Sequence, residues 1–502
     1  MTPPDRPRSR SARALAAVLA ALLALGPATS GAQQFENLPK LGDPSGDELS
    51  PQAERRLGDS IMRQVRRDPS YLDDAELLDY LNRFAAPLVA SPAAGGTGFE
   101  FFAIRDGAIN AFALPGGFIG IHTGLLTAAE SESEVAAVLA HEIGHVVQRH
   151  IARMLARQKQ VSMVAMAGMI LALLAARSNP QAAMGSMMMG NEAARSSMLS
   201  FSREAEREAD RVGFEIMRQS GFDVQAMVAF FMRLQSASRF YESNAPAYLR
   251  THPVTTERIG DMQLRVQETR YRQRADAIEF TLLRARLRAT ADDSSEGRKT
   301  ARGLAEQQVR QSPKAGPGPW YGLAAVALAQ RDFARVDAAL TQAQALAGGT
   351  HPFLEALGAR ARLDAGDPGA AADRATKGLS RFPDARALAR LQGEALLAAG
   401  RPGEAARALR DHLVSWRSDP KLWALLSQAH ADLGQRADAH RAAAEQYLRL
   451  GSPMAALDQL RRAQQAGDTD FYTASTIDAR IRELEPEALR EMEEARQQGG
   501  GR

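Results

Sequence analysis

The feature that most constrains the fold is a regular repeat in the second half of the chain. Gly366, Gly400 and Gly434 are equally spaced, and alanine-rich helical sequence lies on both sides of each glycine. A period of about 34 residues is typical of helix–turn–helix units that stack side by side, because one unit cannot bury its apolar face alone. The spacing therefore predicts an α-solenoid. Prolines recur near the starts of the units, at Pro352, Pro383, Pro420 and Pro453.

This period resembles the tetratricopeptide repeat in its length. We expect about four units, and in the first of them Arg331 or Asp332 stands where the turn glycine is expected. A helical bundle without repeats is the alternative. Stacked units bury a continuous core and leave a concave surface for a partner segment. This half is therefore predicted to be a binding module and not a catalytic one.

A metal-binding pattern lies in the first half of the chain, where residues 141–145 read HEIGH. His141 and His145 are four residues apart, so on a helix both imidazoles lie on one face and can reach one metal ion. Glu142 projects beside them, where it can take a proton from a water held by the metal. The run 131–157 predicts one amphipathic helix with a capping box at its start. The pattern indicates a catalytic zinc site on this helix.

Two histidines require a third protein ligand, with water in the open position of the metal. Among the other histidines, His122 and His252 are candidates. His150 is set aside, because five residues past His145 it points to another face of the predicted helix. Carboxylates in the segment 202–210 are further candidates.

The segment 202–210 offers two carboxylate pairs of equal spacing. Glu206 and Asp210 are four residues apart and share a helix face, so one could bind the metal while the other orients a ligand imidazole. Glu204 and Glu208 are also four apart. Spacing alone does not choose between the pairs, and a solvated charged face is the alternative to both.

Residues 1–32 have the composition of a secretory signal. A basic start precedes an apolar stretch at 14–25, which is too short to span a bilayer, and small residues up to Ala32 offer a cleavage site. This segment carries four arginines and one aspartate, so the net charge of +3 belongs to it and the remaining chain is neutral. No nucleic-acid partner is therefore expected.

The chain contains no cysteine. Disulfides and thiolate metal ligands are excluded, so any zinc must be held by His, Asp or Glu, as in a catalytic site. We therefore expect the chain to be exported through the Sec pathway and to reside in the periplasm.

Three short strands are predicted before the zinc helix, over 99–104, 108–114 and 118–123. We expect one of them to offer an open edge near the metal, to which an extended substrate adds as a further strand. The candidates for this edge are Asn110, Ala111, Phe112 and Ala113. An ordinary core hairpin, with the substrate bound elsewhere, is the alternative.

The chain resembles the HtpX-like zinc metallopeptidases, and within them a periplasmic branch with the same domain order. The resemblance rests on the run 110–113 with the glycines at 116 and 117, on HEIGH, on the Glu206-x-x-x-Asp210 pattern, on the run 251–253 and on the repeats. It implies one Zn²⁺ per chain, with Glu206 as the third ligand and Asp210 behind the ligands. His252 would either occupy the open zinc position and hold the enzyme inactive or stabilise the oxyanion during turnover.

The resemblance also implies a fold class and a function. The fold would be mainly α with a small β-sheet, an α+β metallopeptidase domain of the gluzincin type followed by the α-solenoid. The function would be degradation of misassembled outer-membrane proteins, with assistance to their assembly. Stalled clients or the assembly machinery would bind the repeats. A chaperone or adaptor whose peptidase is normally self-inhibited is the alternative.

The predicted organisation of the chain has five parts and one segment of uncertain role. Residues 161–190, which are rich in methionine, are a candidate for peripheral membrane contact. The parts are a signal peptide at 1–32, a zinc metallopeptidase domain at 33–270, a helical linker at 271–299, tetratricopeptide repeats at 300–490 and a disordered tail at 491–502.

Overall fold

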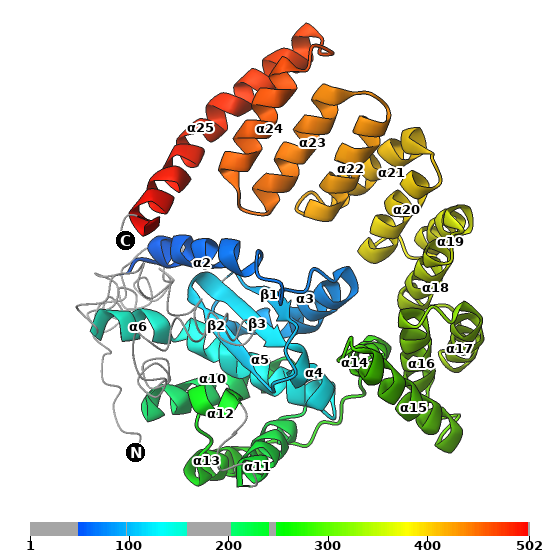
Figure 1. Ribbon diagram of the computed structural model, residues 1–502. Helices are drawn as coiled ribbons and strands as arrows, with labels where there is room; N and C mark the ends of the chain where they lie inside the picture. The colour runs from blue at the N-terminus through cyan, green and yellow to red at the C-terminus, as the bar shows by residue number, and fades with distance from the viewer. Residues whose placement is uncertain (1–48, 97, 158–201, 240–246, 500–502) are drawn as a thin grey trace, which may run out of the picture.

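The computed structural model describes residues 49–96, 98–157, 202–239 and 247–499. A small sheet with helices around it forms the first part, and a curved array of helices follows (Figure 1). The expected fold class, mainly α with a small sheet, is confirmed. The expectations for residues 1–32 and 161–190 lie outside the described residues.

The first part contains one sheet and its covering helices. Its elements are α2 (Pro51–Val65), α3 (Ala75–Val89), η1 (Pro92–Ala94), β1 (Glu100–Ile104), β2 (Ala111–Leu114), η2 (Pro115–Gly117), β3 (Phe118–His122), α4 (Thr123–Ala128), α5 (Glu132–Val147), α6 (His150–Arg157), α10 (Arg203–Gln219), α11 (Gln225–Arg239), α12 (Ala247–Thr251) and α13 (Thr256–Gln267).

The sheet has the order β1-β3-β2, in which β1 pairs with β3 in parallel and β2 pairs with β3 in antiparallel fashion. Strand β3 is buried along its whole length because it lies in the centre. Gly120 of β3 is required by its neighbours, since a Cβ atom there would lie 2.4 Å from the Phe112 ring and 2.8 Å from the Phe102 ring. The three predicted strands are confirmed, and β2 lies at an edge.

Helix α5 packs against the sheet and is capped as the sequence predicts. The Ser131 side chain accepts a hydrogen bond from the Glu134 backbone N–H, which closes one side of a capping box. The single helix predicted for 131–157 is wrong. Helix α5 ends at Val147, Arg149 has a left-handed backbone with φ of 52°, and α6 begins at His150.

Helices α5 and α10 approach each other closely through two glycines. A Cβ atom on Gly144 would lie 2.8 Å from the Ala209 carbonyl oxygen, and one on Gly213 would lie 3.0 Å from the backbone of Ala140. The close contact brings the buried face of α10 against the histidines of α5. Local packing thus sets the distance between the two predicted halves of the metal site.

The second part is an array of helix pairs. Its elements are α14 (Ile278–Ala289), α15 (Ser295–Gln311), α16 (Pro317–Ala329), α17 (Phe333–Leu346), α18 (Pro352–Asp364), α19 (Pro368–Arg381), α20 (Arg386–Ala398), α21 (Pro402–Ser415), α22 (Pro420–Asp432), α23 (Arg436–Arg449), α24 (Pro453–Gln465) and α25 (Phe471–Gly499). Helix α25 extends as far as Gly499 and so runs into the segment 491–502 that the sequence analysis assigned to a tail.

Left-handed residues make the tight turns within the predicted pairs. Gly366, Gly400 and Gly434 have φ of 86°, 69° and 74°. In the pair α16–α17 this position belongs to Arg331, with φ of 60°. The repeat read from the glycine spacing is therefore a helix–turn–helix repeat, and Arg331, not Asp332, takes the place of the glycine in the first unit.

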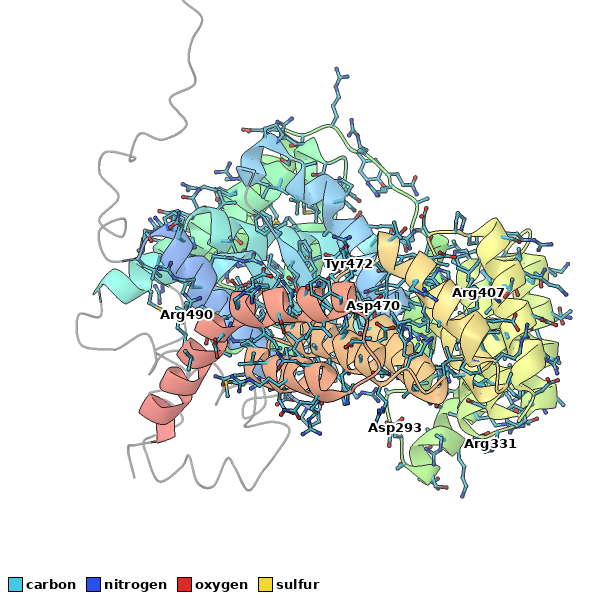
Figure 2. The ribbon with its side chains drawn as sticks, turned by 90° about the horizontal axis from the view of Figure 1, so that it is seen from above. Asp293, Arg331, Arg407, Asp470, Tyr472 and Arg490 are labelled. Carbon is cyan, nitrogen blue, oxygen red and sulfur yellow. The ribbon has the colours of Figure 1, made fainter. Side chains whose placement is uncertain are left out.

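The two parts share one apolar core and several ion pairs. Buried residues from α3 and α5 belong to the same cluster as residues of α14 and α16 to α18. Arg286 of α14 lies 2.7 Å from Asp74, and Arg390 of α20 lies 2.8 Å from Asp73. Figure 2 shows the part of the array that contains the labelled residues Arg331 and Arg407 beside the first part. The array is thus attached to the first part along its length.

Within 49–96, 98–157, 202–239 and 247–499, no helix is long and apolar enough to cross a membrane.

Candidate metal centre

Four buried side chains converge at one point. His141 and His145 come from α5, Glu206 from α10, and His252 follows α12. One ligand atom from each lies within 4.8 Å of the others. The two Nε2 atoms of His141 and His145 are 3.0 Å apart, and each lies 3.5 Å from a Glu206 carboxylate oxygen. These are the donor types that hold catalytic zinc.

The structure resolves the alternatives that spacing left open. Glu206 and Asp210 are 2% and 1% exposed, whereas Glu204 is exposed on the outer face of α10. His122 lies away from the cluster, with its Nδ1 atom 3.2 Å from Asp106. Of the two carboxylate pairs, the buried pair is therefore the one that faces the histidines, and Glu206 is its member in the cluster.

Asp210 and Arg258 support this cluster from behind. A carboxylate oxygen of Asp210 lies 2.9 Å from His141 Nδ1, so the other ring nitrogen of His141 faces the cluster. Arg258 donates to Asp210 at 2.6 and 2.7 Å and lies 2.7 Å from Glu206. Burial alone would raise the pKa of Asp210, but the hydrogen bonds from Arg258 and His141 lower it. Asp210 is therefore held as a carboxylate.

Arg258 is a functional residue that the sequence analysis missed. Its guanidinium is 3% exposed and also donates to the Pro253 carbonyl oxygen at 2.7 Å. It therefore ties the segment that carries His252 to the acidic residues of α10. The sequence offered one sign of this role, because Arg258 lies in the first turn of α13, a few residues after the motif at 251–253.

Glu142 is buried beside the cluster, and its two carboxylate oxygens accept no hydrogen bond from the described residues. The Nε2 atom of His252 lies 3.6 Å from one of them. Burial raises the pKa of Glu142, while His252, His141 and the Ala113 backbone lower it in part. A carboxylate with a raised pKa is suited to accept a proton and to release it again.

His252 covers the cluster. Its Nδ1 atom lies 3.0 Å from Glu206, and its ring stacks on Tyr248 with 4.7 Å between the centroids. The Tyr248 backbone N–H donates to the Ile109 carbonyl oxygen, which ties α12 to the chain just before β2. His252 thus lies in the position where a fourth ligand or a substrate group would reach the metal.

His150 was set aside as a metal ligand and is not among the four converging donors, but its ring does not point to another helix face as expected. Because the helix breaks at Arg149, His150 turns back to place its Nδ1 atom 2.8 Å from His145 Nδ1. Its Nε2 atom lies 3.0 Å from Glu208, which Arg153 contacts at 2.5 Å. Burial lowers the pKa of His150. Glu208, of the pair rejected for the metal, therefore belongs to the surroundings of His145.

The donor set of the cluster fits zinc. Two imidazoles and one carboxylate are the ligands of many catalytic zinc sites, and the buried oxygens of Glu142 lie where an attacking water needs a base. Among the residues that the structure describes, no second group of three or more such side chains converges in this way.

Comparison with known proteins identifies the family. Residues 73–266 match the model of peptidase family M48. The chain is 31% identical over 478 residues to the "Beta-barrel assembly-enhancing protease" of Escherichia coli. The aligned region covers 94% of this chain and 96% of that protein. The chain belongs to the M48 family of metallopeptidases. It is a zinc metalloendopeptidase, and the buried cluster of His141, His145, Glu206 and His252 is compatible with its zinc site.

Two further relatives show how far the likeness extends. A "Putative beta-barrel assembly-enhancing protease" of Vibrio cholerae is 35% identical over 64% of this chain and 66% of its own length. The "Mitochondrial metalloendopeptidase OMA1" of Schizosaccharomyces pombe is 30% identical, but over only 43% of this chain and 62% of its own length. The M48 match lies before the repeats, in the part that contains the metal cluster.

Proposed function

We propose that His141, His145 and Glu206 hold one zinc ion and that Glu142 is the catalytic base of a peptide-bond hydrolase. The observation that carries this proposal is the convergence of the four buried donors beside the Glu142 carboxylate. Asp210 orients His141 through Nδ1 and does not itself bind the metal.

The chemistry divides between the ion and the chain. Bound zinc lowers the pKa of a water molecule and polarises the scissile carbonyl. Glu142 takes the proton of the attacking water and delivers it to the leaving nitrogen. The buried surroundings that raise the pKa of Glu142 make its carboxylate a stronger base toward the attacking water. Glu142→Gln should therefore abolish turnover and leave zinc binding intact, whereas loss of His141 should remove both.

The substrate is proposed to add to the edge of β2. Among the described residues, strand β2 pairs with β3 alone, which leaves its other edge open. Ala113 of this strand lies close enough to Glu142 for its backbone to lower the pKa of that carboxyl. An extended peptide that pairs along 110–113 would thus lie beside the catalytic base, held mainly by backbone hydrogen bonds. Cleavage with weak sequence preference is the expected consequence.

His252 is proposed to hold the site shut. Its ring contacts Glu206, His141 and Glu142, which are the groups that a substrate and its water must reach. His252→Ala is then expected to raise proteolysis of an unfolded protein. A fall in activity would instead favour a role in oxyanion stabilisation and would overturn the proposed inhibition.

The biological setting is proposed to be quality control of outer-membrane proteins in the periplasm. The names of the relatives, the secretory composition of residues 1–32 and the order of parts support this. We retain the division at 33–270, 271–299 and 300–490 as part of the proposal, although the apolar core runs across it.

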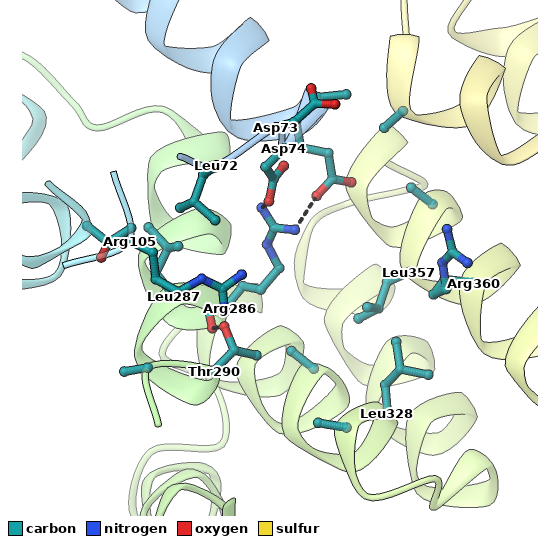
Figure 3. A pocket seen from close by; sticks show the side chains of 18 of the residues that line it. Leu72, Asp73, Asp74, Arg105, Arg286, Leu287, Thr290, Leu328, Leu357 and Arg360 are labelled. Carbon is teal, nitrogen blue, oxygen red and sulfur yellow. Dashed lines mark hydrogen bonds and ion pairs between the residues drawn. The ribbon is translucent and has the colours of Figure 1, made fainter. Parts of the chain in front are cut away.

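Stalled outer-membrane proteins or the assembly machinery are proposed to bind the inner face of the repeats. A cavity of about 980 Å³ lies there, between the start of α3 and the helices α14, α16, α18 and α20. Figure 3 shows Leu328 and Leu357 on its repeat side and Leu72, Asp74 and Arg286 on the opposite side. The cavity lies apart from the metal cluster, so it suits a partner and not the scissile bond.

Complementation separates the peptidase from the alternative function. In a strain that lacks the gene, wild type and Glu142→Gln are compared for outer-membrane integrity and for the level of a misassembled β-barrel protein. Restoration by the wild type alone supports the protease. Equal restoration by both would favour a chaperone or adaptor whose peptidase is normally self-inhibited.

A further inference from the structure

We propose that His150 is a positioning residue that sets the tautomer and the orientation of the zinc ligand His145. The inference rests on the proposed metal site, because it gives His145 the role of a ligand. It is carried by a hydrogen-bonded chain that runs from two buried histidines to a partly exposed carboxylate: His145 contacts His150 at 2.8 Å, and His150 contacts Glu208 at 3.0 Å.

The proton positions along this chain follow from its acidic end. The Glu208 carboxylate, which Arg153 also contacts, accepts hydrogen bonds and does not donate them. The Nε2 atom of His150 must therefore carry a proton and donate it. In a neutral imidazole the other nitrogen is then an acceptor, so His145 Nδ1 must donate to His150.

The proton on Nδ1 of His145 determines what the ring offers to the metal at its other nitrogen, Nε2. With its proton on Nδ1, His145 presents a lone pair at Nε2, which faces His141 Nε2 and Glu206 at 3.0 and 3.5 Å. The opposite tautomer would place a proton between ligand and ion. A metal-binding histidine usually donates its outer N–H to a partner that holds the ring in place, and Asp210 does this for His141. His150 does it for His145.

The backbone break at Arg149 makes this contact possible. On a continuous helix a residue five positions on lies well around the helix from His145 and cannot contact its ring. Arg149 takes a left-handed conformation, with φ of 52°, which is strained for a residue with a side chain. Its guanidinium donates to the Leu49 carbonyl oxygen at 2.5 Å and lies 3.4 Å from Glu54, so α2 and the chain before it hold the break.

Zinc affinity of the full-length chain tests the inference, measured by competition with a chelator of known affinity. His150→Leu removes the acceptor and should weaken zinc binding by about 10–100-fold. His150→Asn places an oxygen near the former Nδ1 position and should recover most of the loss. Cobalt-substituted protein gives a second readout, because the visible absorption of Co²⁺ should change in the Leu variant and return in the Asn variant.

A buried histidine outside the cluster provides the matched control. His122 is 3% exposed, as is His150, but pairs with Asp106. His122→Leu should bind zinc as tightly as the wild type. If His150→Leu does so too, while His145→Ala loses zinc, the inference is wrong and the metal site stands. If His145→Ala keeps full affinity, the proposed metal site itself is wrong.

The wild-type protein provides a test that does not depend on the folding of a variant. Nitrogen-15 spectra of the histidine rings in the zinc-loaded chain distinguish the tautomers. We expect a proton on Nε2 of His150 and on Nδ1 of His145. A proton on Nδ1 of His150 would overturn the inference.

Discussion

Replacement of Arg258 tests how the cluster is held together. Arg258→Met keeps most of the length of the side chain and removes the guanidinium between α10 and α13. That group is 3% exposed and makes contacts of 2.6 and 2.7 Å to Asp210 and 2.7 Å to Glu206. The variant leaves two buried carboxylates without their cation.

The expected loss of stability is large because Arg258 and both of its carboxylate partners are buried. Removal of one partner of a buried ion pair costs about 3–5 kcal/mol. For a cooperative unit of about 150–250 residues, each kcal/mol lowers the melting temperature by about 2–4 °C. The melting temperature of the first part should therefore fall by about 6–20 °C. In chelator-treated protein the loss should be greater, since Glu206 then lacks the zinc ion as well.

Thermal unfolding followed by circular dichroism measures this, in a Glu142→Gln background that prevents self-cleavage. The chain offers a matched control, because Arg207 and Glu257 form an ion pair of 2.9 Å between the same two helices. Their side chains are 37% and 66% exposed, so Arg207→Met should cost at most about 1 kcal/mol. The reasoning is refuted if the two variants lower the melting temperature equally.

Three further predictions concern the joint between the two parts and the packing behind the site. Burial raises the pKa of Glu76 to about 8, despite the nearby Arg286. This pKa lies above the ordinary value of 4.5, so the folded protein favours the protonated form of Glu76. The stabilisation that protonated Glu76 contributes is complete below pH 4.5 and is lost as the pH rises through about 8. Stability in urea should fall from pH 6 to 9, and Glu76→Gln should flatten that dependence; an unchanged slope would contradict it. Gly213→Ala would place a Cβ atom 3.0 Å from the backbone of α5 and should cost about 1–3 kcal/mol and weaken zinc binding, as urea unfolding and chelator competition would show. Asp73→Ala removes a partly exposed contact to Arg390 and should cost at most about 1 kcal/mol, but hydrogen exchange in α20 should become faster. Unchanged exchange there would show that the shared apolar core holds the array without this ion pair.

Local sequence patterns predicted the parts of the structure that depend on near neighbours. The alternation of apolar and turn residues predicted all three strands, and the equal spacing of the repeat glycines predicted the helix pairs with their left-handed turns. The spacing in HEIGH predicted that His141 and His145 share one helix face. Such features follow from backbone geometry within a few residues, which sequence spacing reports directly.

Patterns failed where a tertiary contact decided the outcome. One helix was predicted over 131–157, but Arg149 is held in a left-handed conformation by contacts to residues about 100 positions earlier in the chain. His150 was consequently assigned to the wrong face. Arg258 gave only a weak signal because its partners, Asp210 and Glu206, are about 50 residues away.

The sequence by itself determined that this chain has a pair of histidines for zinc, a base beside them and a solenoid of helices after them. The tertiary structure decided which carboxylates face the histidines, because Glu206, Asp210 and the exposed Glu204 share one helix and differ only in the face that packs on α5. It also placed His252 over the cluster and His150 behind it. Both positions depend on where separate helices meet, and residue spacing along one chain segment carries no information about that.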